Sequence, residues 1–304
     1  MLSALGPMRE AIFRAQLALD EGKEVVFVCF RRDIAEFLTP LRSEKIHIHL
    51  HEESLTFTVS KILGEIARIR AFKRKLAQLY GHLISAEVWC YGSSISLTSI
   101  LALHYFSGRE TVFYNGVYEG RGAADGIFLQ KTKSLWRRVK AAMLSLCSGA
   151  DIEFVRDWSP VPVLAEKYIQ EKTRPAPLWN SANPRVAIEK PLLRPCNKQI
   201  LLLFTNYSDY YRANEQDKAA FETFCETLGE MLRISAPGRG VAVKPHPTCS
   251  KLPANWNWME QFDPQFPLEF IDMTNVRVIL GDASTSMISP MNLDHKPVVS
   301  FAKL

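Results

Sequence analysis

Short apolar runs alternate along the chain with longer stretches in which apolar residues recur every three or four positions. The runs VVFVCF at 25–30 and ILLLF at 200–204 are typical of buried strands, and the longer stretches have the period of amphipathic helices. The predicted strands are Val25–Phe30, Ile46–Leu50, Val88–Tyr91, Thr111–Asn115, Ile152–Val155, Gln199–Thr205, Gly240–Lys244, Leu268–Ile271, Val276–Leu280 and Pro297–Phe301. The predicted helices cover residues 7–21, 54–80, 94–106, 131–147, 161–171 and 214–233.

This alternation predicts an α/β fold with parallel sheets, because strands joined through helices run in one direction and are covered on both faces. Residues 176–198 are rich in proline and lack periodicity, which indicates a linker. The linker separates an N-terminal domain, 1–175, from a C-terminal domain, 199–304, and a length of 304 residues suits two domains. Ligand sites in such sheets lie at the carboxyl ends of strands, where the motifs described below occur.

Charge and cysteine usage narrow the function classes. The net charge is +5, and residues 1–150 hold 20 Lys and Arg against 14 Asp and Glu, so the N-terminal half is basic and suits an anionic partner. The cysteines are scattered without a C-x-x-C pair, which indicates reduced thiols in the cytoplasm. The basic stretches Arg68–Lys75 and Lys131–Lys140 fit helices that either contact an anionic membrane surface, peripherally at the inner membrane, or are solvated. No nucleic-acid-binding pattern is present, so no such partner is expected.

The tetrad Lys244-Pro245-His246-Pro247 follows an apolar strand. Proline fixes its own φ and restricts the residue before it, so the two prolines hold His246 in a narrow range of conformations. An imidazole held at a strand end suits hydrogen bonding or proton donation to a phosphate leaving group. The alternative is a structural histidine that caps a neighbouring carbonyl group.

The stretch GDASTSM at 281–287 follows another apolar strand. Three hydroxyl side chains and the free N–H groups of a helix start would together form a phosphate site. An ordinary helix N-cap has the same composition, so this alternative stays open. The hydroxyl residues are Ser284, Thr285 and Ser286.

The loop NGVYEGRGAADG at 115–126 is rich in glycine, which permits tight turns and close approach of the backbone to a ligand. Glu119 lies within it and could take a proton from an acceptor hydroxyl. Asp125 is a second candidate for this base, and a solvated acidic loop is the alternative to both.

The sequence also bears on metal binding. It contains no D-x-D, a carboxylate pair that can hold Mg²⁺ or Mn²⁺, and a histidine-assisted leaving group needs no metal. The run HIHLH places His47, His49 and His51 on one face of a strand, where three imidazoles could ligate zinc. A surface or edge strand with histidines is the other interpretation, and we expect no metal site.

The three loop motifs, in this order, resemble those of bacterial sialyltransferases of the GT-B type, a group that includes lipooligosaccharide sialyltransferases and capsular polysialyltransferases. Glu119-Gly120 resembles the acidic-Gly motif of their N-terminal half, although Tyr118 stands where the family has a further acidic residue. His246-Pro247 resembles their HP motif, and Ser284–Ser286 resembles their Ser/Thr motif. The segment GPMREAIFRAQLALDEG at 6–22 is similar to the first helix of the lipooligosaccharide group.

The resemblance implies a GT-B fold, in which the parallel sheets of two Rossmann-like domains face a central cleft. Residues 1–175 would form the acceptor side and residues 199–304 the nucleotide-sugar side. The implied activity is inverting, metal-independent transfer of sialic acid or a related nonulosonic acid. The donor would be a CMP-sugar and the acceptor a surface glycan or glycolipid of lipooligosaccharide or capsule, with no cofactor.

The resemblance also implies roles for single residues. Glu119 would be the base, and His246 would assist the departing CMP phosphate. The expected phosphate and nucleotide ligands are Lys244, Ser284, Thr285, Ser286, Thr205 and Asn206. A CMP-Kdo transferase or a CDP-glycerol-type polyol-phosphate transferase of the same fold remains an alternative, as does a non-catalytic protein that binds glycan or nucleotide.

Overall fold

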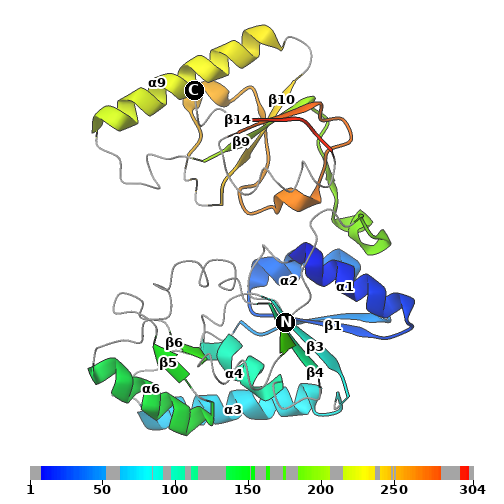
Figure 1. The fold of residues 1–304 in the computed structure, drawn as a ribbon, viewed down its shortest axis with the longest axis vertical. Coiled ribbons are helices and arrows are strands. Elements are labelled where there is room, and N and C mark those ends of the chain that lie inside the picture. The colour runs from blue at the N-terminus through cyan, green and yellow to red at the C-terminus, as the bar shows by residue number, and fades with distance from the viewer. Residues whose placement is uncertain are drawn as a thin grey trace. The chain divides into compact units, whose positions relative to one another are not determined.

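The protein is a mixed α/β fold built on parallel sheets, and its chain divides into two compact units, Met1–Leu178 and Trp179–Leu304 (Figure 1). We call them unit 1 and unit 2 and describe each by itself. The computed structural model describes residues 8–52, 62–83, 85–91, 97–106, 111–115, 135–150, 152–154, 162–164, 174–175, 184–205, 215–236, 240–247, 249, 251–281 and 295–300.

Unit 1 alternates strands and helices through most of its length. Its helices are α1 (Met8–Asp20), α2 (Arg32–Leu38), α3 (Ile62–Tyr80), α4 (Leu97–Phe106) and α6 (Leu135–Ser148), and a short 3-10 turn spans Thr39–Leu41. Its strands are β1 (Val25–Cys29), β2 (Ile46–Leu50), β3 (Glu87–Tyr91), β4 (Thr111–Asn115), β5 (Ile152–Phe154), β6 (Pro162–Leu164) and β7 (Arg174–Pro175).

The described strands of unit 1 pair as follows. β1 pairs with β2, and β3, β4 and β7 form a three-stranded group in that order, with every pairing parallel. β5 and β6 form an antiparallel pair. The main core lies where α3, α4 and α6 meet β3 and β4, and Phe72, Leu76, Ile100 and Leu144 are fully buried in it. This burial of apolar helix faces is the main stabilising contribution to the unit.

Unit 2 contains one long helix, α9 (Glu215–Ser235), and a five-stranded parallel sheet. The strands of the sheet are β9 (Ile200–Phe204), β10 (Val241–Pro245), β11 (Glu260–Gln261), β13 (Val278–Gly281) and β14 (Val298–Ser300). Their order is β11-β10-β9-β13-β14. A separate two-stranded pair joins β8 (Arg194–Pro195) to β12 (Ile271–Asp272), and 3-10 turns span Ala187–Leu192, Ala254–Trp256 and Leu268–Phe270.

The two faces of the unit 2 sheet are buried in different ways. On one face, alternate residues such as Leu202 and Val243 pack with α9 and with Trp256. On the other face, Leu201 and Leu203 pack against the segment from Phe262 to Val276. Because both faces are covered, the strands read as continuous apolar runs rather than as alternating ones.

Most of the predicted elements are confirmed where the structure describes them, and the ends of the matching strands differ by at most two residues. The predicted strand at 152–155 is β5, for example, and the predicted helices 7–21, 94–106, 131–147 and 214–233 are α1, α4, α6 and α9. The helix predicted at 54–80 is described from Ile62 onward as α3. Sequence reasoning missed α2 and β11 altogether.

Two predicted elements are wrong where the structure describes them. Within the helix predicted at 161–171, Pro162–Leu164 is strand β6, because it pairs antiparallel with β5 and the β-branched Val163 suits a strand. Within the strand predicted at 268–271, Leu268–Phe270 is a 3-10 turn, closed by the N–H of Phe270, which donates to the carbonyl oxygen of Pro267 at 3.1 Å.

Candidate functional site at the carboxyl edge of the unit 2 sheet

The strand order of unit 2 creates a preferred place for a ligand. Proceeding from β9, the chain adds β10 and β11 on one side and then crosses to β13 and β14 on the other. The strand order therefore reverses between β9 and β13. In open α/β sheets the crevice outside the carboxyl ends of the strands at such a reversal is where ligands bind. Here those ends are Phe204 of β9 and Gly281 of β13, with Pro245 of β10 on the other side of β9.

The structure brings His246 and Thr205 together at this edge. Pro245 lies opposite Phe204, so the residues that follow them leave the sheet side by side. The N–H of His246 donates to the carbonyl oxygen of Phe204 at 2.7 Å, which extends the ladder by one residue beyond the strand. The carbonyl oxygen of His246 accepts from the N–H of Cys249 at 2.8 Å and closes a turn. His246 and Thr205 are both half-buried.

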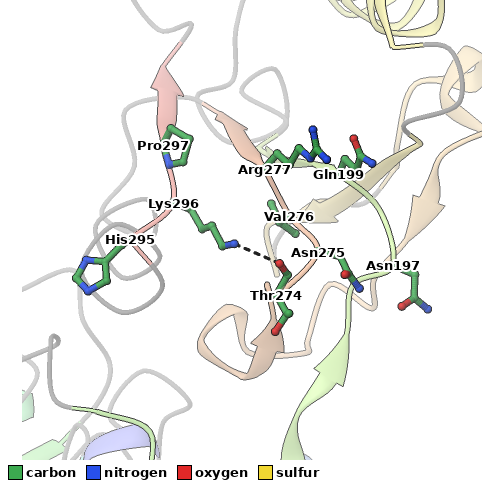
Figure 2. Close-up of a pocket in the computed structure, with 9 residues that line it drawn as sticks. All are labelled: Asn197, Gln199, Thr274, Asn275, Val276, Arg277, His295, Lys296 and Pro297. Carbon is green, nitrogen blue, oxygen red and sulfur yellow. Dashed lines mark hydrogen bonds between the residues drawn. The ribbon is translucent and has the colours of Figure 1, made fainter.

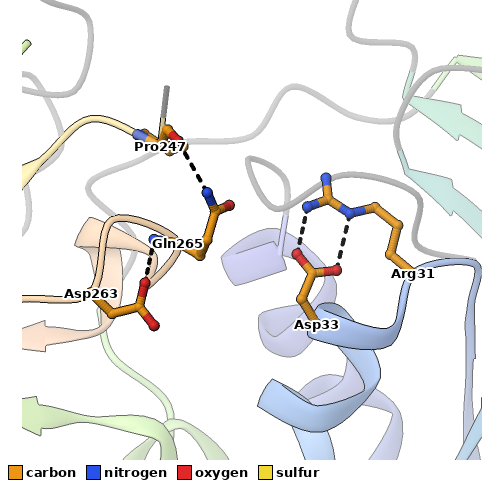
Figure 3. A network of polar contacts seen from close by, with 5 residues as sticks. All are labelled: Arg31, Asp33, Pro247, Asp263 and Gln265. Carbon is orange, nitrogen blue, oxygen red and sulfur yellow. Dashed lines mark hydrogen bonds and ion pairs between the residues drawn. The ribbon is translucent and has the colours of Figure 1, made fainter. Parts of the chain in front are cut away.

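The prolines are held in place by the segment that follows β11 (Figure 3). The side-chain amide of Gln265 donates to the carbonyl oxygen of Pro247 at 3.0 Å, and the N–H of Gln265 donates to the Asp263 carboxylate at 2.8 Å. Sequence reasoning missed Gln265. The Asp263-Pro264 dipeptide indicates a turn. No local pattern indicates that Gln265, which follows it, contacts Pro247, 18 positions earlier.

Lys244 supports the same turn from inside. Its side chain is only 6% exposed, and its ammonium group donates to the carbonyl oxygens of Pro245 at 2.7 Å and Pro264 at 2.9 Å. Burial lowers the pKa of this ammonium to about 8, while the nearby carboxylates Asp263 and Glu269 oppose the shift. Two of its three hydrogens are therefore used on main-chain carbonyls, which leaves one for any phosphate.

The other predicted site residues lie outside the described residues. In unit 2 these are Asn206, Ser284, Thr285 and Ser286. Gly281, the last described residue before the three hydroxyl residues, lies opposite Leu203 at the carboxyl edge.

Glu119 and Asp125 of unit 1 also lie outside the described residues. The strand before them, β4, ends at Asn115 opposite Tyr91 of β3, so the predicted loop starts from the carboxyl edge of its sheet as well.

His47 and His49 alternate with apolar residues along β2 and His51 follows its end, and a tyrosine contacts His49 and His51. The Tyr80 hydroxyl lies 2.7 Å from Nε2 of His51 and 3.1 Å from Nδ1 of His49. Burial, together with the charges of His47 and Arg42, lowers the pKa of His49. Among the described residues, no group of three His, Cys, Asp or Glu side chains is placed to hold a metal ion. The role of Tyr80 had no local sequence signal, because Tyr80 lies at the end of a separate helix, 29 residues after His51.

An opening lies at the opposite edge of the unit 2 sheet (Figure 2). It measures about 730 Å³ and is lined by Asn197, Gln199, Thr274, Asn275, Val276, Arg277, His295, Lys296 and Pro297. Gln199, Arg277 and Pro297 come just before β9, β13 and β14, so this cavity lies at the amino ends of the strands. We place the candidate site at the carboxyl edge despite the size of this cavity, because the strand-order reversal and the proline-held His246 both occur there.

Comparison with protein-family models, with curated proteins and with solved structures finds no match for this chain. Of the helices that the structure describes, none combines the length and the apolar character needed to cross a bilayer.

Proposed function

We propose that the protein is an inverting glycosyltransferase of GT-B architecture, which moves sialic acid or a related nonulosonic acid from a CMP-sugar to a surface glycan. The observation that carries this proposal is the position of His246, which follows β10 and is fixed beside the end of β9, one of the two strands between which the strand order reverses. Mixed α/β units with parallel sheets are compatible with the architecture.

In the proposed reaction the acceptor hydroxyl oxygen attacks the anomeric carbon of the donor. The bond between that carbon and the phosphate oxygen breaks as the new glycosidic bond forms, and CMP leaves. Glu119, or Asp125 in its place, takes the hydroxyl proton, and His246 donates a proton or hydrogen bond to the departing phosphate. The proline-flanked turn holds His246 in position before the substrate binds. The reaction therefore does not include the entropy cost of ordering this residue.

The remaining proposed residues bind the donor. Ser284, Thr285 and Ser286 would hold the phosphate, and Thr205 and Asn206 would line the nucleotide pocket. Lys244 would contribute mainly by fixing the turn through Pro245 and Pro264. The proposed reaction uses no metal.

The surface of α6 supports contact with an anionic membrane, where a lipid-linked acceptor would lie. Leu135, Trp136 and Val139 are 73%, 60% and 42% exposed. They alternate with the basic residues Arg137, Arg138 and Lys140 on the first turns of the helix. Apolar and basic side chains on one short helical stretch are typical of helices that lie in the bilayer interface.

Nucleotide binding tests the donor class. In a thermal-shift series with CMP, CDP, UDP and GDP, we expect CMP to raise the melting temperature most. A response to CDP with none to CMP would favour the polyol-phosphate transferase alternative, and no response to any nucleotide would contradict the proposal. CMP binding without turnover of any CMP-sugar would favour the non-catalytic alternative.

A matched pair of histidine variants tests the chemistry. We expect His246→Asn to lower CMP release in the presence of acceptor by about 100-fold or more, the usual size of a general-acid contribution. His295→Asn is the control, because His295 lies at the amino edge with φ of +49°, a conformation that asparagine tolerates. Equal activity of the two variants would refute the role of His246. Activity should persist in EDTA, and a strict need for Mn²⁺ would refute the metal-free mechanism.

A further inference from the structure

The cavity at the amino edge of the unit 2 sheet has no role in the proposed reaction. It measures about 730 Å³, which is within the range of about 300–1,000 Å³ that is usual for small-molecule sites. The residues that line it come from the starts of β9, β13 and β14 and from the turn before β13, and Figure 2 shows how they lie. Their chemistry indicates what kind of molecule the cavity would bind.

A row of polar residues crosses this edge of the sheet. The carbonyl oxygen of Gln199 accepts from the N–H of Arg277 at 2.7 Å, so these two residues are neighbours at the starts of β9 and β13. In the pairing of β13 with β14, Ile279 lies opposite Val298. Continuing this register by two residues toward the amino edge places Arg277 beside Lys296. Gln199, Arg277 and Lys296 therefore follow one another across three neighbouring strands.

Arg277 and Lys296 place two positive charges on neighbouring strands. Such strands lie about 4.8 Å apart, and like charges that face each other across them repel. Among the described residues neither side chain forms an ion pair, and the Lys296 ammonium group donates to the carbonyl oxygen of Thr274 at 3.4 Å (Figure 2). The Asp272 carboxylate is within electrostatic reach of Lys296 but accepts from the N–H and hydroxyl of Thr274 and does not line the cavity. A bound anion would therefore reduce the repulsion.

The lining also contains several neutral amide groups. The side-chain amides of Asn197, Gln199 and Asn275 form no hydrogen bond with another described residue, so their donors and acceptors are available to a ligand. An amide group both donates and accepts, which suits the hydroxyl groups of a carbohydrate. The His295 side chain points away from Arg277 (Figure 2), and we do not count it among the groups that would bind the ligand.

The lining disfavours three other classes of ligand. None of the described lining residues is acidic, so a cationic molecule would meet only the positive charges of Arg277 and Lys296. None of them carries a Phe, Tyr or Trp ring, on which a nucleobase would stack. The apolar side chains among them are those of Val276 and Pro297, so a mainly apolar molecule would leave most of the polar groups unpaired.

We propose that this cavity is a binding site for a phosphorylated sugar. Arg277 and Lys296 would bind the phosphate group, because a guanidinium group matches phosphate oxygens with two parallel hydrogen bonds and an ammonium group binds phosphate as a point charge. The three amide side chains would bind the sugar hydroxyls. The site lies at the edge of the sheet opposite to that of His246, so it is separate from the proposed CMP-sugar site, and the inference does not rest on the proposed function.

Isothermal titration calorimetry of the full chain tests the ligand class. The probes are glucose 6-phosphate, glucose, inorganic phosphate, glucuronate and CMP. We expect glucose 6-phosphate to bind at least about tenfold more tightly than glucose or inorganic phosphate, because it alone of the three offers hydrogen-bonding groups to both the cations and the amides. Glucuronate should bind more weakly than glucose 6-phosphate, because its carboxylate carries one charge and a phosphate monoester carries nearly two.

Variants of the two cations test the location of the site. Arg277→Gln and Lys296→Gln should each weaken the binding of glucose 6-phosphate at least about tenfold, because each removes a charge-assisted hydrogen bond. Neither should lower the melting temperature of the ligand-free protein, because each removes one charge of a repelling pair. The matched control is Arg233→Gln, which removes the same charge from α9, where Arg233 is paired with Glu230 at 2.7 Å. Its affinity for glucose 6-phosphate should stay within about twofold of the wild type.

Several outcomes would overturn the proposal. Absence of glucose 6-phosphate binding, equal affinity for inorganic phosphate, or tighter binding of glucuronate would each contradict a sugar phosphate as the ligand. CMP binding that is lost in Arg277→Gln would indicate a nucleotide site at this edge instead. Unchanged affinity in both Arg277→Gln and Lys296→Gln would place the binding elsewhere. Equal weakening by Arg233→Gln would show that binding follows the net charge of the protein and not the groups of this cavity.

Discussion

Gly229, in the middle of α9, is expected to tolerate no side chain. A Cβ atom placed on it would lie 2.6 Å from Nε1 and 2.7 Å from Cδ1 of Trp256. The indole is fully buried, its N–H donates to the carbonyl oxygen of Cys225 at 3.0 Å, and its ring meets Phe204 edge-on with centroids 4.7 Å apart. The ring is therefore held from three sides and is not the far end of a flexible side chain.

The Gly229→Ala variant sets two effects against each other. Alanine is the better helix former and would stabilise α9 by up to ~1 kcal/mol. Overpacking a buried ring costs about 1–3 kcal/mol. If the ring moves far enough to break its hydrogen bond to Cys225, the buried indole N–H adds about 1–3 kcal/mol. From these opposing effects we expect a net loss of about 2 kcal/mol in the free energy of unfolding of unit 2.

Gly64→Ala is the matched control. Gly64 is also a helical glycine, but it is exposed, and a Cβ atom placed on it would meet no other described atom within 4 Å. We expect this variant to be neutral or stabilising by up to ~1 kcal/mol. Urea denaturation followed by far-UV circular dichroism and tryptophan fluorescence measures both variants. If Gly229→Ala is as stable as Gly64→Ala, Trp256 is not seated on α9. Since the carbonyl oxygen of Phe204 accepts the His246 N–H, a shifted Trp256 should speed exchange of that amide.

Three further variants probe the stability of each unit. The Lys244 pKa of about 8 in the folded state lies below its ordinary value of 10.5, so the unfolded chain binds more protons at this site between these values and the Lys244 contribution to stability should rise with pH there by up to ~3 kcal/mol. Burial raises the pKa of the Cys225 thiol to about 12, which acts in the opposite direction over this range. The Lys244 contribution is therefore measured as the difference between the wild type and Lys244→Met in pH-dependent urea melts. Tyr80→Phe removes the hydroxyl that buried His51 contacts and should cost unit 1 about 1–3 kcal/mol in the same assay; no loss would refute the importance of that contact. Arg185→Met removes the ion pair, 3.6 Å long, between Arg185 and the carboxylate of Glu189, which is 0% exposed. We expect it to lower the free energy of unfolding of unit 2 by about 3–5 kcal/mol. A loss below about 1 kcal/mol would contradict this expectation.

Local patterns in the sequence were enough for most of the elements. Runs such as Ile200–Phe204 and Val241–Val243 are apolar because both faces of the parallel sheet are buried, and this makes them recognisable in the sequence. The predicted elements were wrong where the conformation of a segment depends on a neighbouring segment. Pro162–Leu164 is a strand because β5 lies beside it, and Leu268–Phe270 closes a 3-10 turn on Pro267.

The candidate site divides in the same way. The prolines around His246 mark a fixed histidine at a strand end, and the structure places that histidine one hydrogen bond from Phe204. The sequence alone did not indicate that the Lys244 ammonium group donates hydrogen bonds to the carbonyl oxygens of Pro245 and Pro264. Pro264 lies 20 residues away and becomes a neighbour only in the folded sheet.

The amino-acid sequence by itself determined that this protein is a series of parallel strands joined through helices, with a rigid His-Pro turn after one of them, because backbone geometry and burial period are local properties. Only the tertiary structure decided the strand order, and with it the meeting of Thr205 and His246 at the edge where the order reverses. Strand order depends on which strand edges, far apart in the sequence, pair in the packed core. The periodicity of apolar residues is a local property and does not specify that pairing.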